Sequence, residues 1–352
     1  MKIKNILYLG WLGQGNVGDD VLFELFKTLF YKYSTLHQKN IAVNIDTFHQ
    51  DRRYQMSLSS YDLIVLGAGS LMHLPYWINI CKEAMNVDIP VVSWGSGIDG
   101  NYKNDQELTE KVASMKQYQS FYEKIDYLSV RGPLTKKTLE KIGIKNDIHE
   151  IGDPALHYVA ETYGDIMDSP DNKKQILINW GTSYNNIFGH NEEKVENELV
   201  KVIHDLLAQG YNVKIYPIWT EDILAVQKLT AKVADKRCEA QTVVYDAKGT
   251  QKIIQDSFLT INMKLHANIL SASANKPFIS LAYRGKCFDF SHTVQCLDYT
   301  VATDQLTASN IIQLVEHINN NYDDIINNFI RAKKIYHPRL LDSIKFIANL
   351  LH

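Results

Sequence analysis

The feature that most constrains the fold is an alternation that runs along the whole chain. Short apolar runs are followed by longer segments with helical character. This pattern is typical of α/β proteins, in which parallel strands are joined by helices. In the first half we predict strands at 5–9, 41–46, 63–66, 91–94, 127–130 and 148–151, with helices at 21–30, 106–122 and 134–142. In the second half we predict strands at 176–180, 213–216, 242–245, 258–263 and 278–281, with helices at 192–207, 223–234 and 253–255.

The length of the chain, 352 residues, indicates about two domains. A polar segment at 167–174 separates the two alternating series and is the best linker candidate. We therefore predict an α/β fold with two Rossmann-like domains, 1–168 and 169–320, that face a central cleft. Residues 321–352 are predicted to form C-terminal helices, interrupted by Pro338, that can cross back to the first domain.

Composition excludes several classes of protein. The formal net charge of -3 does not favour a nucleic-acid partner. The four cysteines form no C-x-x-C pair and no zinc-like group with histidine, so we expect neither a disulfide framework nor a metal site. The first apolar run is too short for a signal peptide or a membrane span. We expect a cytoplasmic protein and leave association with the inner face of the membrane open.

A basic turn follows the predicted strand at 258–263. Lys264 and His266 then lie in the opening turn of a helix, where unpaired N–H groups and the helix dipole favour negative charge. Lys286 follows in a second short motif, Tyr283-Arg284-Gly285-Lys286. This arrangement predicts that the second domain binds an anion.

The loop after the first strand carries a Gly-x-Gly-x-x-Gly pattern at 13–18, which imitates a dinucleotide-binding fingerprint. Asp19 and Asp20 follow it, and two carboxylates at a helix N-terminus would repel a pyrophosphate. Carboxylates and an amide suit hydroxyl groups better, so we interpret Asn16, Asp19 and Asp20 as contacts to a sugar. The alternative is that Asp19 only caps the helix.

Other strand ends in the first domain carry residues suited to a ligand. The glycine-rich turn at 67–71 contains Ser70 and allows a ligand to approach the backbone. Arg131 ends a strand, where its guanidinium could clamp a carboxylate or phosphate with two hydrogen bonds. The alternatives are a tight turn for 67–71 and a structural salt bridge for Arg131. Asp153 either orients Arg131 or starts a turn before proline.

In the second domain, Gly181 and Thr182 close the first predicted strand. Their small side chains and backbone N–H groups could form an anion-binding nest. A simple turn explains these two residues equally well.

Taken together, these pieces resemble the polysaccharide pyruvyl transferase family. The resemblance lies in the Gly-x-x-Gly-x-Gly-Asn-x-Gly-Asp loop at 10–19, the turn at 67–71, the motifs at 129–131 and 152–154, and His266 followed by Tyr283-x-x-Lys286. The chain departs from the family pattern at Lys264, where an arginine is expected, and at Arg284, where an acidic residue is common. The resemblance implies a GT-B-like architecture, phosphoenolpyruvate as donor and a pyruvate ketal on a sugar.

This chemistry agrees with the residues. Phosphoenolpyruvate carries a carboxylate and a phosphate, so its site needs several cations, and Arg131, Lys264, His266 and Lys286 are candidates from both domains. Transfer requires a proton on the enol methylene, then attack by a sugar hydroxyl and loss of phosphate. His266 titrates nearest neutrality and could supply that proton or assist departure of the phosphate.

A base for the acceptor hydroxyl could be Asp19, Asp20 or Asp153, and these alternatives stay open. The chemistry requires no metal and no cofactor besides phosphoenolpyruvate as co-substrate. We predict a transferase of cell-wall or exopolysaccharide biosynthesis whose sugar acceptor is free, lipid-linked or polymeric. The predicted residues are catalytic His266 and Arg131; donor-binding Arg131, Lys264, His266, Lys286, Gly181 and Thr182; and acceptor-binding Asn16, Asp19, Asp20 and Ser70.

Three rival interpretations remain. The first is a GT-B glycosyltransferase that uses a nucleotide sugar, because the same architecture with a basic second domain would hold a diphosphate. The second is a noncatalytic sugar-binding protein, which Lys264 and Arg284 make conceivable. The third and weakest is a nicotinamide-dependent enzyme built on the glycine pattern at 13–18.

Overall fold

The computed structural model describes residues 2–34, 36, 40–48, 57–104, 107–159 and 174–351. The chain forms two compact units. Unit 1 comprises Met1–Gly13, Asp19–Pro154 and Lys334–His352, and unit 2 comprises Gln14–Gly18 and Ala155–Lys333. Of the predicted linker at 167–174, only Lys174 lies within the described residues.

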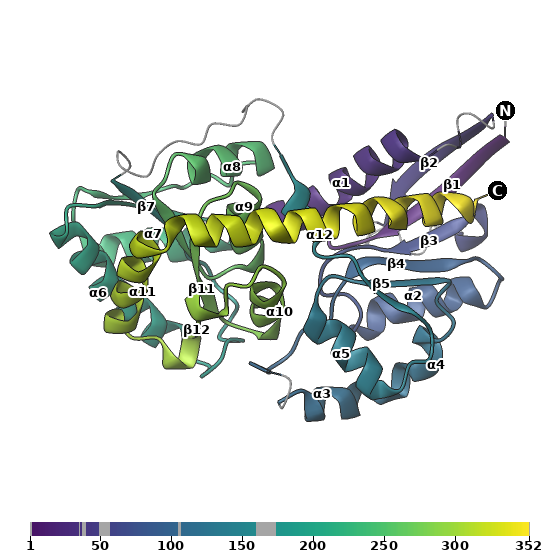
Figure 1. Ribbon diagram of the computed structural model, residues 1–352, viewed down its shortest axis with the longest axis horizontal. Coiled ribbons are helices and arrows are strands. Elements are labelled where there is room, and N and C mark those ends of the chain that lie inside the picture. Colours follow the sequence, from purple (N-terminus) through teal and green to yellow (C-terminus); the bar gives the residue numbers. More distant parts are fainter. Residues whose placement is uncertain are drawn as a thin grey trace. The chain divides into compact units, whose positions relative to one another are not determined.

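Unit 1 contains a parallel sheet of six strands in the order β2-β1-β3-β4-β5-β6 (Figure 1). All six strands predicted in this half of the chain are confirmed. The strands are β1 (Lys2–Leu9), β2 (Ile41–Thr47), β3 (Leu63–Leu66), β4 (Val91–Ser96), β5 (Tyr127–Val130) and β6 (Ile148–Glu150). The helices are α1 (Val17–Tyr33), α2 (Pro75–Met85), α3 (Leu108–Met115), α4 (Gln119–Tyr122) and α5 (Pro133–Ile142).

Helices cover both faces of this sheet, and β1 shows why. Successive side chains of a strand point to opposite faces. Leu7 and Leu9 are buried in one core cluster with Trp77 of α2. Tyr8, between them, packs its ring against Phe26 of α1 at 5.2 Å between centroids. A strand that is buried on both faces has no solvent-facing side that needs polar residues, which explains the continuous apolar run in the sequence.

Unit 2 contains a second parallel sheet, in the order β12-β11-β10-β7-β8-β9. This is the strand order of a dinucleotide-binding fold, with the first strand of the unit at the centre. The strands are β7 (Gln175–Asn179), β8 (Asn212–Tyr216), β9 (Cys238–Ala240), β10 (Leu259–Asn262), β11 (Phe278–Ala282) and β12 (Thr300–Ala302). The helices are α6 (Glu192–Ala208), α7 (Ile223–Val233), α8 (Ala247–Gln255), α9 (Leu265–Ser273), α10 (Gly285–Thr293) and α11 (Ala308–Asn320).

The predicted strand at 242–245 is wrong, because the edge strand β9 lies earlier, at Cys238–Ala240. Val243 is 59% exposed, so its apolar side chain does not mark a buried strand. Asp246 is instead the N-cap of helix α8. Its Oδ1 accepts a hydrogen bond of 2.7 Å from the Gly249 amide. The predicted helix at 253–255 is only the last turn of α8.

The predicted interruption of the C-terminal helices at Pro338 is also wrong. Helix α12 runs from Tyr322 to Asn349 with Pro338 inside it. Proline removes one helical hydrogen bond, at a cost of about 3 kcal/mol, and packing on both sides of it offsets that cost. The part of α12 from Lys334 onward belongs to unit 1, where Trp94 Nε1 donates to Ser343 Oγ at 3.1 Å. This confirms the expected return of the C-terminal segment to the first domain.

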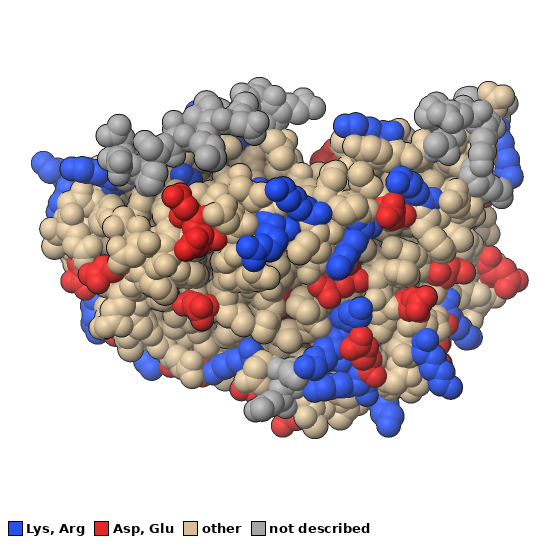
Figure 2. Space-filling model, in the orientation of Figure 1, with Lys and Arg blue, Asp and Glu red and all other residues tan. Residues whose placement is uncertain are grey.

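The surface mixes charges of both signs. Figure 2 shows Lys and Arg side chains interspersed with Asp and Glu on the face drawn. This pattern agrees with the small net charge of -3. Within the described ranges, none of the helices is both long enough and apolar enough to cross a membrane.

Candidate functional site

Each sheet has one place where the strand order reverses, and the predicted residues follow strands around it. In unit 1 the reversal lies between β1 and β3, and in unit 2 between β7 and β10. Ligands of open α/β sheets bind beyond the carboxyl ends of the strands at such a point.

Arg131 directly follows β5 and is only 4% exposed. Its Nη2 donates to Ser70 Oγ at 3.0 Å, so the structure brings these two predicted residues together. Gly97 makes room for the guanidinium, because a Cβ there would overlap Nε of Arg131. Within the described part of the chain, no carboxylate forms an ion pair with Arg131, so the structural salt bridge considered above is absent. A buried cation without a counter-ion is costly, which points to an anionic ligand.

Acidic residues of the same sheet edge lie near Tyr8, at the end of β1. Its hydroxyl accepts a hydrogen bond from the Ala68 amide at 3.1 Å. Gly67 must be small, because a Cβ there would overlap the Tyr8 ring. Burial raises the pKa of Tyr8, and the charges of Asp19 and Asp153 raise it further. Two of the three candidate bases therefore lie near this edge.

The residues around the start of α1 have distinct roles. The helix begins at Val17, and Asn16 Oδ1 accepts from the Gly18 amide at 3.1 Å, so Asn16 rather than Asp19 caps it. Asp19 and Asp20 lie in the first turn. Asp20 Oδ1 accepts from the backbone of the preceding loop at 3.3 Å, and burial raises its pKa.

Residues Gln14–Gly18 of this loop pack as part of unit 2. The Val17 amide donates to the Ile218 carbonyl at 3.1 Å, and Trp219 Nε1 donates to the Gln14 carbonyl at 3.0 Å. A Cβ at Gly18 would overlap the imidazole of His266. The third glycine of the pattern therefore lets the backbone approach His266.

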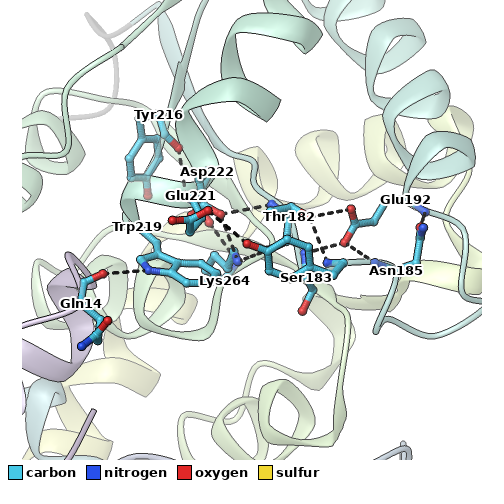
Figure 3. Close-up of polar contacts among 12 residues, drawn as sticks. Gln14, Thr182, Ser183, Asn185, Glu192, Tyr216, Trp219, Glu221, Asp222 and Lys264 are labelled. Atoms are coloured by element: carbon cyan, nitrogen blue, oxygen red, sulfur yellow. Dashed lines mark hydrogen bonds and ion pairs between the residues drawn. The ribbon is translucent and has the colours of Figure 1, made fainter. Parts of the chain in front are cut away.

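Lys264 lies at the carboxyl end of β10 and forms a buried ion pair (Figure 3). Its Nζ is 3.1 Å from Oδ1 of Asp222 and donates to the Thr182 carbonyl at 2.5 Å. The same ammonium lies 5.0 Å from the ring centroid of Trp219. Burial raises the pKa of Asp222, while the charge of Lys264 acts in the opposite direction. The protein itself thus compensates the charge of Lys264.

Sequence reasoning missed Asp222, although the rule used for the other loops could have found it. Asp222 lies in the loop after β8, at the same sheet edge as the residues that follow β7. Its Oδ1 accepts from the Thr182 amide at 3.1 Å. Gly181 must be small here, because a Cβ would overlap the carboxylate. Gly181 and Thr182 therefore hold Asp222 in place.

Glu192, in the first turn of α6, was also missed. Its Oε2 accepts from Thr182 Oγ1 at 3.0 Å, and its Oε1 accepts from the amides of Ser183 and Asn185 at 2.5 and 3.1 Å. The Thr182 amide of the predicted nest thus donates to Asp222, and two amides that follow it in the loop donate to Glu192. The loop after β7 is rigidly held as a result.

His266 and Lys286 lie at the starts of two neighbouring helices. Helix α9 follows β10, helix α10 follows β11, and these two strands pair in parallel. All residues of α9 are buried, including His266, which is 9% exposed. The Lys264 amide donates to Asn179 Oδ1 at 2.9 Å and ties the turn before His266 to β7. Two helix N-termini with an imidazole and an ammonium therefore share one edge, an arrangement that favours anionic oxygen.

No group of three or more His, Cys, Asp or Glu side chains that could hold a metal ion occurs among the residues that the structure describes. The chemical groups at the two edges are instead a guanidinium, an imidazole, an ammonium and carboxylates. These groups bind anions and transfer protons.

Solved structures with the same architecture include a UDP-GlcNAc 2-epimerase and an O-GlcNAc transferase. A UDP-GlcNAc 2-epimerase from Neisseria meningitidis bound to UDP-GlcNAc is 14% identical, with 97% of this chain and 100% of that chain covered and a TM-score of 0.57. The S. aureus MnaA-UDP structure is 12% identical, with 94% and 91% covered and a TM-score of 0.58. A Thermobaculum terrenum O-GlcNAc transferase mutant is 9% identical, with 99% and 66% covered and a TM-score of 0.54. These likenesses confirm the predicted GT-B fold.

The sequence comparison is more specific. No curated protein matches the chain. The family model described as polysaccharide pyruvyl transferase matches residues 16–285, a stretch that contains Ser70, Arg131, Asp222 and His266. This stretch is well over half of the chain. The chain belongs to the polysaccharide pyruvyl transferase family.

Proposed function

We propose that the chain transfers the pyruvyl group of phosphoenolpyruvate to a sugar of a cell-surface polysaccharide or its precursor, forming a ketal and releasing phosphate. Membership of the family supports a transferase. The proposal that the donor is phosphoenolpyruvate rests on Arg131. Its guanidinium is buried and has no carboxylate partner among the described residues. A small metabolite with a carboxylate and a phosphate would supply the missing negative charge.

In this proposal the donor-site residues do not all play the same part. Arg131, His266 and Lys286 bind the anionic groups of phosphoenolpyruvate. Lys264 and Thr182 keep the backbone of the unit 2 edge in place, because their polar groups contact Asp222 and one another, and Gly181 leaves room for the Asp222 carboxylate.

The proposed reaction balances with one donor and two hydroxyls of one sugar. His266 donates a proton to C3 of phosphoenolpyruvate, and C2 becomes electrophilic. The first hydroxyl adds to C2, the C–O bond to phosphate breaks, and the second hydroxyl closes the ketal. Of the two hydroxyl protons, one replaces the proton that His266 gave and the other leaves with phosphate. Such a proton transfer contributes roughly 10²–10⁴-fold to the rate.

The acceptor side of the proposal uses the carboxylates near α1. Asp19 is the candidate base because it lies in the first turn of α1 and is close enough to Tyr8 to affect its pKa. Asn16, Asp20 and Ser70 are proposed to contact sugar hydroxyls, with Asn16 also capping α1. We place the reaction in the cytoplasm, at the inner face of the membrane when the acceptor is lipid-linked.

The test is a screen of sugar acceptors for release of inorganic phosphate from phosphoenolpyruvate, with mass spectrometry of the products. The expected product gains the mass of pyruvate minus water. His266→Ala is expected to lose activity by a factor of roughly 10²–10⁴ while its melting temperature stays near that of the wild type. Wild-type turnover in this variant would remove His266 from the mechanism.

The same preparation tests the nucleotide-sugar rival. Two of the similar structures contain UDP or UDP-GlcNAc. Isothermal titration should show binding of phosphoenolpyruvate to this chain. Binding of UDP without binding of phosphoenolpyruvate would instead favour a glycosyltransferase.

A further inference from the structure

Tyr184 is an exposed aromatic residue in a strained backbone conformation. It follows β7 by a few residues and is 68% exposed. Its φ angle is 54°, in the left-handed region that bulky residues rarely adopt, and Asn185 after it has φ 58°. A conformation that costs energy and exposes an apolar ring contributes nothing to the core. Such outliers persist where the surroundings hold them, and they cluster at ligand sites.

The surroundings hold the backbone of Tyr184 firmly. Its amide donates to Thr182 Oγ1 at 3.0 Å, and that hydroxyl donates to Glu192 at 3.0 Å. On the other side, Asn185 Oδ1 accepts from the Glu192 amide at 2.9 Å. The ring therefore projects from a fixed loop, so a ligand that contacts it pays little ordering entropy.

The side chain of Tyr184 is held as well. Its hydroxyl donates to Oε2 of Glu221 at 3.1 Å, which raises the pKa of Tyr184. The ring meets Trp219 edge to face, at 6.4 Å between centroids and 85° between planes. Trp219 in turn contacts Lys264 and the Gln14 carbonyl. Two perpendicular rings with a carboxylate beside them thus lie next to the carboxyl edge of unit 2.

The chemistry of this cluster suits a sugar ring. A pyranose has an apolar face of C–H groups that can lie on an aromatic ring, and hydroxyls at its edge that donate to a carboxylate. Glu221 is exposed, and its Oε1 has no hydrogen-bond partner among the described residues. A phosphate would be repelled by that carboxylate, which sets the cluster apart from the cationic groups at the same edge.

We infer that Tyr184, Trp219 and Glu221 form a saccharide subsite, in which a pyranose ring stacks on Tyr184 and donates a hydroxyl to Glu221. The inference rests on the proposed function in that the bound sugar is a residue of the acceptor. The subsite determines acceptor affinity and takes no part in the chemical step.

The test is saturation-transfer NMR on the full chain with a panel of methyl hexopyranosides and methyl N-acetylhexosaminides. The wild type is expected to saturate the C–H face of at least one glycoside. Tyr184→Ala should weaken that binding at least ten-fold, and Tyr184→Phe should keep most of it because the ring remains. Glu221→Gln should weaken binding less than loss of the ring does. The absence of saturation in every glycoside of the panel would overturn the inference.

A matched control and a strain control separate binding from folding. Tyr245→Ala removes another exposed tyrosine of unit 2, 41% exposed, and should leave glycoside binding unchanged. Tyr184→Asn suits a positive φ, so it should melt at the wild-type temperature or above and still lose binding. A lowered melting temperature in this variant with glycoside affinity retained would assign Tyr184 a purely structural role.

Titration with phosphoenolpyruvate distinguishes this inference from the proposed function. Tyr184→Ala should bind phosphoenolpyruvate like the wild type. Phosphoenolpyruvate binding without any glycoside contact at Tyr184 would refute the subsite alone. Glycoside contact without phosphoenolpyruvate binding would refute the proposed donor and leave the subsite standing.

Discussion

Arg131 and Lys264 each follow a strand of a parallel sheet, one in each unit, yet the protein compensates their charges differently. Each follows a strand at the carboxyl edge of its parallel sheet, and each is buried. Lys264 has Asp222 at 3.1 Å. Arg131 has the Ser70 hydroxyl at 3.0 Å and no carboxylate partner within the described residues. The difference teaches that a cation at a sheet edge indicates a ligand only when the protein has not already paired it.

Lys333 shows how a partly buried cation is held without a carboxylate. Its Nζ donates to the Ser273 carbonyl at 3.0 Å and to Asn275 Oδ1 at 2.6 Å, both of them uncharged acceptors. Burial lowers the pKa of Lys333 to about 8. Lysine can lose its proton when burial is costly, whereas arginine cannot. Arg131 therefore depends on an external anion more than either lysine does.

The largest expected effect is on Arg131. Arg131→Met should lower kcat/KM for phosphoenolpyruvate by about 10³-fold, close to 4 kcal/mol, because the buried guanidinium that binds the anionic substrate is lost. Arg131→Lys should recover only part of this, since the guanidinium fork is lost. The measurement is steady-state phosphate release with a saturating acceptor.

Stability measurements on the same variant sharpen the comparison. Without phosphoenolpyruvate, Arg131→Met should unfold at the same urea concentration as the wild type or higher, because an unpaired buried charge is gone. Added phosphoenolpyruvate should raise the melting temperature of the wild type only. Arg237→Ala, at an exposed arginine paired with Asp235, should match the wild type in both assays. Strong destabilisation of Arg131→Met would mean that Arg131 is a structural residue like Lys264.

The next effect is on the ion pair of unit 2. Asp222→Asn leaves Lys264 buried without a counter-ion and should lower the free energy of unfolding by about 3 kcal/mol. Lys264→Met/Asp222→Leu together should recover much of that loss, because replacement of both charges by apolar groups is often neutral. Asp342→Asn, in the exposed pair with Lys345, should cost less than about 1 kcal/mol.

The Asp222 prediction is checked by urea denaturation with a double-mutant cycle. The pKa of Asp222 is raised in the folded protein, so its folded form binds the proton more readily than the unfolded form does. Without Lys264 this effect grows, and Lys264→Met should lose more stability at pH 8 than at pH 5. Equal losses at both pH values would contradict the assigned pairing.

The smallest effect is the pH dependence that Lys333 contributes. Its folded pKa of about 8 lies below the ordinary value of 10.5, so between these values the unfolded chain binds more protons than the folded one. Stability should therefore rise as pH increases from 8 to 10.5, by about 2 kcal/mol after allowance for partial exposure. Lys333→Met should lack this rise. A parallel pH profile for both proteins, measured by urea unfolding, would refute the lowered pKa.

Sequence patterns predicted the sheet strands well and the partners of the site residues poorly. Arg131 was found because β5 is a clear apolar run and Pro133 opens the next helix. The rule used for the other loops could have placed Asp222 at the sheet edge, but no sequence pattern marks its hydrogen bond to Thr182, 40 residues away. Glu192 lies only ten residues from Thr182, and no local pattern marks it as the acceptor of that hydroxyl. Pro338 was misread because the local cost of proline is known from sequence, whereas the packing of α12 that offsets it is not.

The sequence by itself determined the alternation of strands and helices, the residues that end each strand, and the family to which the chain belongs. These features depend on local periodicity and on short motifs, and both can be read within a few residues. Tertiary structure alone decided which cations are compensated, which glycine lies against His266, and which exposed ring is held in place. Each of these depends on groups from different strands meeting at one sheet edge, and burial there sets how strongly charges interact.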